Sequence, residues 1–78
     1  MKIEILGTGS EVCKNLFGNA LEALRESGRK GKVVVVKNHQ KLATFGIMAK
    51  PVLIVNGVVR FSGRLVSTEE IVSLLNPV

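Results

Sequence analysis

Apolar and polar residues alternate in the first six positions of this chain of 78 residues. Ile3 and Ile5 fall on one side and Lys2 and Glu4 on the other, which is typical of a strand with one buried face. The turn Gly7-Thr8-Gly9 follows, and its glycines allow positive φ.

A helical pattern occupies residues 11 to 27. Its apolar residues recur at steps of three and four and define one face: Cys13, Leu16, Phe17, Ala20, Ala23 and Leu24. Ser10 is the predicted N-cap, and Gly28 is the predicted C-terminal stop. Gly18 lies inside this helix, where glycine costs about 1 kcal/mol relative to alanine unless another segment packs closely against it.

Two segments follow this helix. Residues 32–37 (KVVVVK) form a continuous β-branched run, which is typical of a parallel strand covered on both faces. Residues 38–45 are predicted to form a short helix that Asn38 caps and Gly46 ends.

The last third of the chain carries two strong local signals. Residues 51–55 and 58–62 are joined by Asn56-Gly57, which predicts a β-hairpin because a type I′ turn needs positive φ at both central positions. Ser67 with Glu70 three residues later predicts a capping box at the start of a final helix that ends near Leu75.

The resulting order, β-α-β-α-β-β-α, predicts a single domain over residues 1–78. A strand, a crossover helix and a second strand form a right-handed parallel unit. The hairpin should add its first strand antiparallel to the opening strand. We therefore expect an α/β fold with a four-stranded mixed sheet and helices on both faces.

Composition and charge narrow the function classes. The chain is 46% hydrophobic but has only three Phe and no Trp or Tyr, which argues against an aromatic platform for nucleic-acid bases. The net charge is +5, with much of the excess between Arg25 and Lys41. We interpret this excess as a solvated face rather than a site for nucleic acid or an acidic partner, because no nucleic-acid-binding motif accompanies it.

Cys13 is the only cysteine, which rules out an internal disulfide and a disulfide-stapled secreted scaffold. The first residues lack a signal-peptide pattern, and no stretch reaches the roughly 20 apolar residues of a membrane span. We therefore expect a cytoplasmic protein with no membrane partner. His39 has no Cys or His near it in the sequence, so we expect neither a metal nor a cofactor.

Cys13 falls in the first turn of the predicted helix. The positive end of the helix dipole favours a thiolate there, and Lys14 adds a positive charge. The other interpretation is a small buried hydrophobe, which a lone cysteine on an apolar stripe more often is. The residues alone leave both interpretations open.

Several motifs together carry a resemblance that covers nearly the whole chain. The chain resembles the thioredoxin-like superfamily, and within it the short archaeal and bacterial thioredoxin/glutaredoxin-like proteins sometimes called redox-active disulfide proteins. Their Gly-Thr-Gly-Cys-x-x-Cys-Lys turn, Gly-Val/Ile-Met-x-x-Pro segment, Asn/Asp-Gly turn, Gly-Arg pair and Ser-x-Glu-Glu-Ile helix start match residues 7–14, 46–51, 56–57, 63–64 and 67–71. The match is weakest from Gly28 to Thr44.

The resemblance implies catalytic positions at Ser10 and Cys13. In the family the first position is an exposed nucleophilic cysteine, and the second cysteine resolves the mixed disulfide. Here Ser10 stands at the first position, and a hydroxyl cannot replace a thiolate in disulfide exchange. The dithiol reductase cycle is therefore expected to be absent. The sequence leaves open whether Ser10 is natural or an engineered replacement of cysteine.

The resemblance also implies a substrate-binding edge, to which we assign Gly9, Glu11, Val12, Lys50 and Pro51. In the family the proline is cis and faces the active-site turn, and an extended peptide or glutathione pairs with the preceding backbone. A trans proline at the first residue of a strand is the ordinary alternative. Lys50 replaces the usual Thr or Ser and would favour an anionic partner.

Three function hypotheses follow. The first is a thiol–disulfide redox protein that retains only the resolving cysteine, Cys13. Its partner would be a thiol- or disulfide-containing protein or a small thiol. The second is a redox-inactive binding module that uses the same groove for a peptide or protein. The third is a basic accessory domain for an acidic partner, whose binding would fall steeply with salt. The oligomeric state is open.

Overall fold

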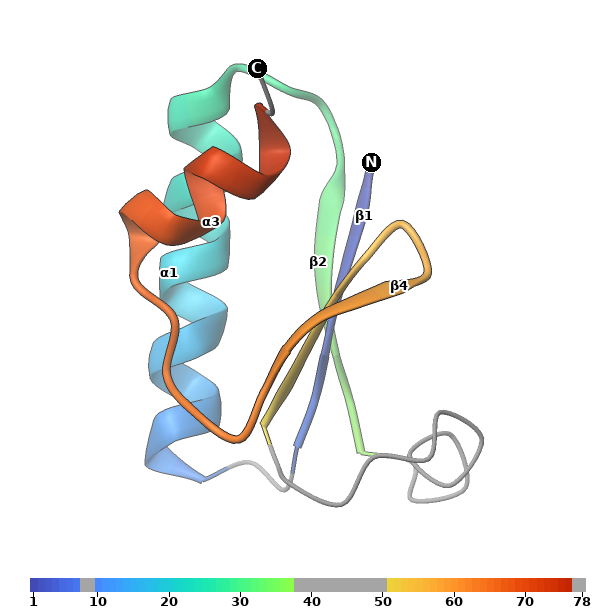
Figure 1. The fold of residues 1–78 in the computed structure, drawn as a ribbon, viewed down its shortest axis with the longest axis vertical. Helices are drawn as coiled ribbons and strands as arrows, with labels where there is room; N and C mark the ends of the chain where they lie inside the picture. Colours follow the sequence, from blue (N-terminus) through green and yellow to red (C-terminus); the bar gives the residue numbers. More distant parts are fainter. Residues whose placement is uncertain (8–9, 38–50, 77–78) are drawn as a thin grey trace.

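The computed structural model describes residues 1–7, 10–37 and 51–76 and confirms the α/β class (Figure 1). Each element begins and ends within about one residue of the position that the sequence predicts. In chain order, the described elements are β1 (Lys2–Leu6), α1 (Glu11–Ser27), β2 (Lys32–Val36), β3 (Val52–Val55), β4 (Val58–Ser62) and α3 (Thr68–Leu75).

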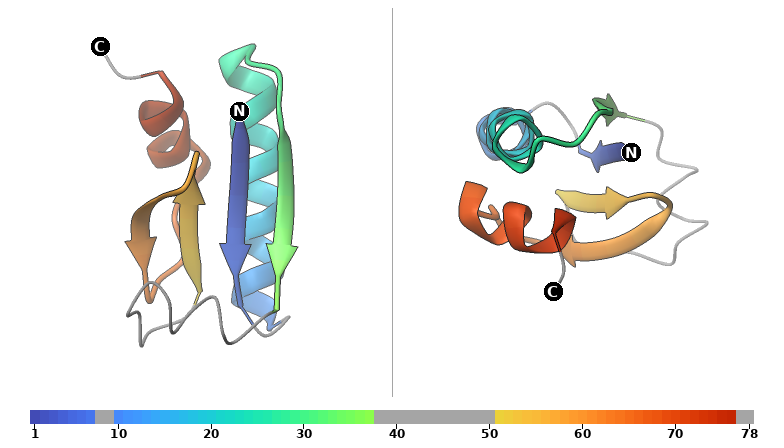
Figure 2. Two further views of the ribbon diagram at one scale, coloured as in Figure 1. Left: turned by 90° about the vertical axis from the view of Figure 1, so that its right-hand side faces the viewer. Right: turned by 90° about the horizontal axis from the view of Figure 1, so that it is seen from above.

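The four strands form one mixed sheet in the order β2-β1-β3-β4. β1 pairs with β2 in parallel, with Ile3 opposite Val33, and it pairs with β3 antiparallel, with Ile3 opposite Val55. β4 returns antiparallel to β3. The predicted parallel pair and the antiparallel hairpin are therefore both confirmed, and Figure 2 shows β1 and β3 in the middle of the sheet.

β2 corrects one prediction. The β-branched run was expected to be covered on both faces, but no side chain of β2 is buried, and Val35 is 37% exposed on this edge strand. The reason is topological, since β3 pairs with the other side of β1 and no strand within the described ranges borders β2 on its outer side. A continuous valine run favours a strand but does not fix its place in the sheet.

Both described helices pack on one face of the sheet and against each other. The core on this face combines buried side chains of α1 and α3 with Ile3, Ile5 and Leu53. The opposite face carries a smaller buried cluster of Leu6, Val52 and Ile54. The helix predicted at 38–45, which was expected to give helices on both faces, lies outside the described residues.

The local turn and cap signals are confirmed. Asn56 and Gly57 have φ of 50° and 82°, as a type I′ turn requires. The backbone N–H of Asn56 donates to the carbonyl of Lys2 at 2.8 Å, and the N–H of Lys2 donates to Oδ1 of Asn56 at 2.9 Å. The turn is thereby fastened to the start of β1. Gly28 ends α1 in the left-handed region, with φ of 73°.

The capping box of α3 is also confirmed, and an ion pair reinforces it. The N–H of Glu70 donates to Oγ of Ser67 at 3.2 Å, and the N–H of Ser67 donates to the Glu70 carboxylate at 3.4 Å. Arg64 meets the same carboxylate at 2.7 Å. The hydrogen bond from Arg64, followed by that from the Ser67 backbone, lowers the pKa of Glu70 from 4.5 to about 2.

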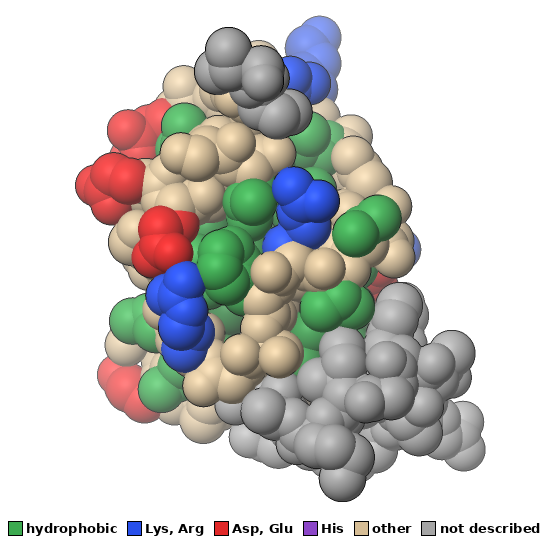
Figure 3. Space-filling view, viewed as in Figure 1, with side chains coloured by type: hydrophobic (Ala, Val, Ile, Leu, Met, Phe, Trp, Pro, Cys, Tyr) green, Lys and Arg blue, Asp and Glu red, His purple; other side chains and the backbone are tan. Residues whose placement is uncertain are grey.

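The charged side chains are unevenly distributed. All the acidic residues except Glu4, which is buried on β1, lie on the two described helices: Glu11, Glu22, Glu26, Glu69 and Glu70. Figure 3 shows acidic side chains gathered along the helical edge of one face of the molecule. Neither of the helices described is long and apolar enough to cross a membrane.

Candidate functional site

Ser10 caps the helix that carries Cys13. Its backbone is extended, with φ of −66° and ψ of 171°, and the N–H of Cys13 donates to its Oγ at 3.3 Å. The N–H of Lys14 donates to the Ser10 carbonyl at 3.0 Å. The predicted N-cap is thus confirmed, and it leaves the Ser10 side chain exposed at the helix end.

The Cys13 side chain points away from solvent and is 1% exposed. It packs against Gly7, where an added Cβ atom would lie 2.8 Å from Sγ of Cys13 and 3.9 Å from Cβ of Pro51. The N–H of Gly7 donates to the carbonyl of Val36 at 3.2 Å, which holds this backbone beside β2. Gly7, Cys13 and Pro51 therefore adjoin at the end of β1.

Gly7 has a packing role in the first turn. The glycines of this turn allow positive φ, but Gly7 does not lie in the left-handed region. A side chain is excluded there by the nearness of the Cys13 sulfur, a long-range contact that no local turn signal contains. Thr8 and Gly9 lie outside the described residues.

The predicted substrate-binding residues are only partly visible. Glu11 and Val12 are exposed in the first turn of α1, with Val12 40% exposed. Pro51 is buried directly before β3, and its carbonyl accepts a hydrogen bond from the N–H of Gly63 at 2.9 Å. Gly9 and Lys50 lie outside the described residues. The contact of this set with a substrate, and the isomer of the bond before Pro51, stay predictions.

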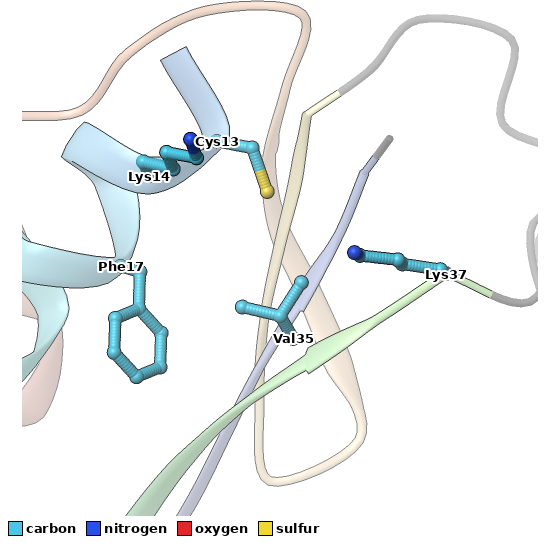
Figure 4. A pocket seen from close by; sticks show the side chains of 5 residues that line it. All are labelled: Cys13, Lys14, Phe17, Val35 and Lys37. Carbon is cyan, nitrogen blue, oxygen red and sulfur yellow. The ribbon is translucent and has the colours of Figure 1, made fainter. Parts of the chain in front are cut away.

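A pocket of about 260 Å³ opens between α1 and the end of β2 (Figure 4). Its lining consists of Cys13, Lys14, Phe17, Val35 and Lys37. This pocket was not predicted from the sequence. The spacing of Cys13 and Phe17 on one helical face could have indicated half of it, but the other half depends on how β2 pairs with β1.

The chemistry of the site is that of a single thiol. Within the described ranges, no group of three or more His, Cys, Asp or Glu side chains could hold a metal ion. His39 lies outside those ranges. Ser10 supplies a hydroxyl and Cys13 is the chain's one cysteine, so a disulfide within the chain is impossible.

Comparisons with known proteins agree with this geometry. The family model described as thioredoxin domain matches residues 1–76. A curated relative described as thioredoxin, from Methanothermobacter thermautotrophicus, is 38% identical over 76 residues, which cover 97% of this chain and 99% of the relative. No solved structure gave a significant match. The family match includes Gly7, Ser10, Cys13 and Pro51.

Proposed function

This chain belongs to the thioredoxin family, and from that membership we propose that it is a thiol–disulfide redox domain whose dithiol cycle is blocked at position 10. Disulfide exchange begins when a thiolate attacks a disulfide sulfur and ends when a second thiol resolves the mixed disulfide. Ser10 holds the position of the attacking group, and its hydroxyl is not a thiolate. Cys13 holds the position of the resolving group.

One observation carries this proposal. Ser10 is exposed at the N-terminus of α1 and its Oγ accepts from the N–H of Cys13, whereas the Cys13 side chain is 1% exposed. An incoming disulfide would therefore contact the hydroxyl oxygen of Ser10, because the sulfur of Cys13 is buried. Position 10 is thus exposed and position 13 is buried, and the exposed residue carries no sulfur.

The partner we propose is a thiol- or disulfide-containing protein or a small thiol. Glu11 and Val12 are exposed beside Ser10, and Pro51 adjoins Gly7 and Cys13. These residues, with Gly9 and Lys50, would form the edge that an extended segment of the partner contacts. A reducing cytoplasm suits a chain with a single buried thiol.

The variant Ser10→Cys tests this proposal. We expect it to form an intramolecular disulfide on oxidation, seen as the loss of two hydrogens by mass spectrometry, and to catalyse insulin reduction by dithiothreitol. The wild-type protein and Ser10→Ala should remain at the uncatalysed rate, although Ser10→Ala should lose about 1 kcal/mol of stability with the cap. Wild-type catalysis as fast as that of Ser10→Cys would refute the proposal.

The burial of Cys13 favours a second candidate, a redox-inactive binding module. The two candidates differ in the alkylation of Cys13 by iodoacetamide, measured from about pH 4 to 10 beside a urea-unfolded control. Rapid reaction of the native protein supports a working thiol. Reaction only on unfolding supports the binding module, in which Cys13→Ala should leave partner binding unchanged.

A further inference from the structure

The pocket between α1 and β2 has a lining that thiol exchange does not explain. Phe17 and Val35 supply its apolar walls, and the sulfur of Cys13 lies at one end (Figure 4). Val35 is 37% exposed and Phe17 is half-buried, so solvent reaches these walls. Concave sites that combine apolar walls with a few charged groups are the usual form of small-molecule sites.

Two ammonium groups complete the pocket. Lys14 comes from α1 and Lys37 follows β2, and Figure 4 shows the Lys37 side chain extended toward the helix. Neither ammonium group has an ion-pair or hydrogen-bond partner among the residues that the structure describes, and no described acidic side chain lines the pocket. The charge of the pocket is thus positive and uncompensated, on a chain whose net charge is +5.

A second copy of the chain is a poor occupant. Docking through the neighbouring edge of β2 would pair two strands that each carry lysines just before and just after the valine run, at Lys32 and Lys37. In an antiparallel pair these like charges meet, and lysines on an edge strand discourage such pairing. A volume of about 260 Å³ also suits a small molecule better than a protein surface.

We propose that this pocket binds a small amphipathic organic anion. Its carboxylate or sulfonate lies between Lys14 and Lys37, and its apolar body packs on Phe17 and Val35 against the Cys13 sulfur. The site goes beyond the proposed redox function, because binding needs no bond to sulfur and no second thiol.

Two fluorescent probes with the same aromatic body test the proposal. One is 8-anilinonaphthalene-1-sulfonate, which is anionic, and the other is N-phenyl-1-naphthylamine, which lacks the sulfonate. Each is titrated into the wild-type protein and into the variants Lys14→Gln, Lys37→Gln, the double variant, and Lys30→Gln. Lys30 is an exposed lysine outside the pocket, so Lys30→Gln is the matched control for the loss of one charge.

We expect the wild-type protein to bind the sulfonate about five- to tenfold more tightly than the neutral probe, as two partly exposed charge pairs allow. The double variant should lose this preference but still bind the neutral probe, and Lys30→Gln should keep the preference. In ¹⁵N-NMR spectra, the sulfonate should shift the amides of Cys13, Phe17 and Val35. Equal affinity for both probes, an equal effect of Lys30→Gln, or shifts confined to other residues would overturn the proposal.

Discussion

The side chain of Cys13 packs so closely against Gly7 that position 7 has no room for a side chain. A Cβ atom at position 7 would lie 2.8 Å from Sγ of Cys13 and 3.3 Å from its Cβ. We expect Gly7→Ala to lower the free energy of unfolding by about 1–3 kcal/mol, the usual cost of overpacking. Urea unfolding with an unchanged m-value measures the loss.

A double-mutant cycle distinguishes this contact from a general effect on the backbone. Cys13→Ala removes Sγ, the nearer of the two Cys13 atoms, so Gly7→Ala should cost less in that background than in the wild-type protein. An equal cost in both backgrounds would show that the sulfur is not the obstacle.

Gly18 offers the opposite prediction. It lies exposed within α1, and an added Cβ atom would meet nothing within 4 Å. The sequence left open a close packing partner at this position, and none is present in the described part of the chain. We therefore expect Gly18→Ala to raise the free energy of unfolding by about 0.4–1 kcal/mol. A lower urea midpoint for Gly18→Ala would contradict this prediction.

At the level of strands and helices, features with local causes were predictable. Asn56-Gly57 specifies its turn through its own φ angles, and Ser67 caps α3 through a residue three positions away. The edge position of β2 and the sulfur contact at Gly7 were not predictable, because both depend on how distant segments pair. Ser10 was predictable as a cap for the same local reason, whereas the pocket beside Cys13 was not.

The start of α3 should respond to acid through Glu70. Its pKa is lowered from 4.5 to about 2, first by the hydrogen bond from Arg64 and then by the Ser67 backbone. A lowered pKa in the folded state stabilises the fold fully above the unfolded value, near 4.5, and the gain is lost as pH falls toward about 2. Glu70→Gln should therefore flatten the dependence of stability on pH in this window.

Glu69→Gln is the matched control for that measurement, because it removes the same charge from the neighbouring position outside the capping box. Thermal unfolding of the three proteins between about pH 2 and 5 gives the comparison. The prediction fails if Glu69→Gln flattens the profile as much as Glu70→Gln does.

Across the whole molecule, stability should be greatest at the centre of the sheet and least at its edges. Figure 2 shows β1 and β3 between β2 and β4. The side chains of β1 beyond Lys2 and of β3 are buried, whereas those of β2 and β4 are all half-buried or exposed. Central strands open only when the domain unfolds, and edge strands open locally. Native-state hydrogen exchange should therefore give the global free energy for β1 and β3, and lower values for β2 and β4.

The outer edge of β2 allows this prediction to be made residue by residue. The N–H of Lys32 donates to the carbonyl of Met1, and the carbonyl of Val36 accepts from the N–H of Gly7. Because backbone groups alternate in direction along a strand, the N–H and carbonyl groups of Lys32, Val34 and Val36 face β1. Those of Val33 and Val35 then point outward. In a monomer their amides should exchange faster than that of Val34. Equal protection would mean that another chain pairs with this edge, and it would place that chain beside the pocket at Val35 and Lys37.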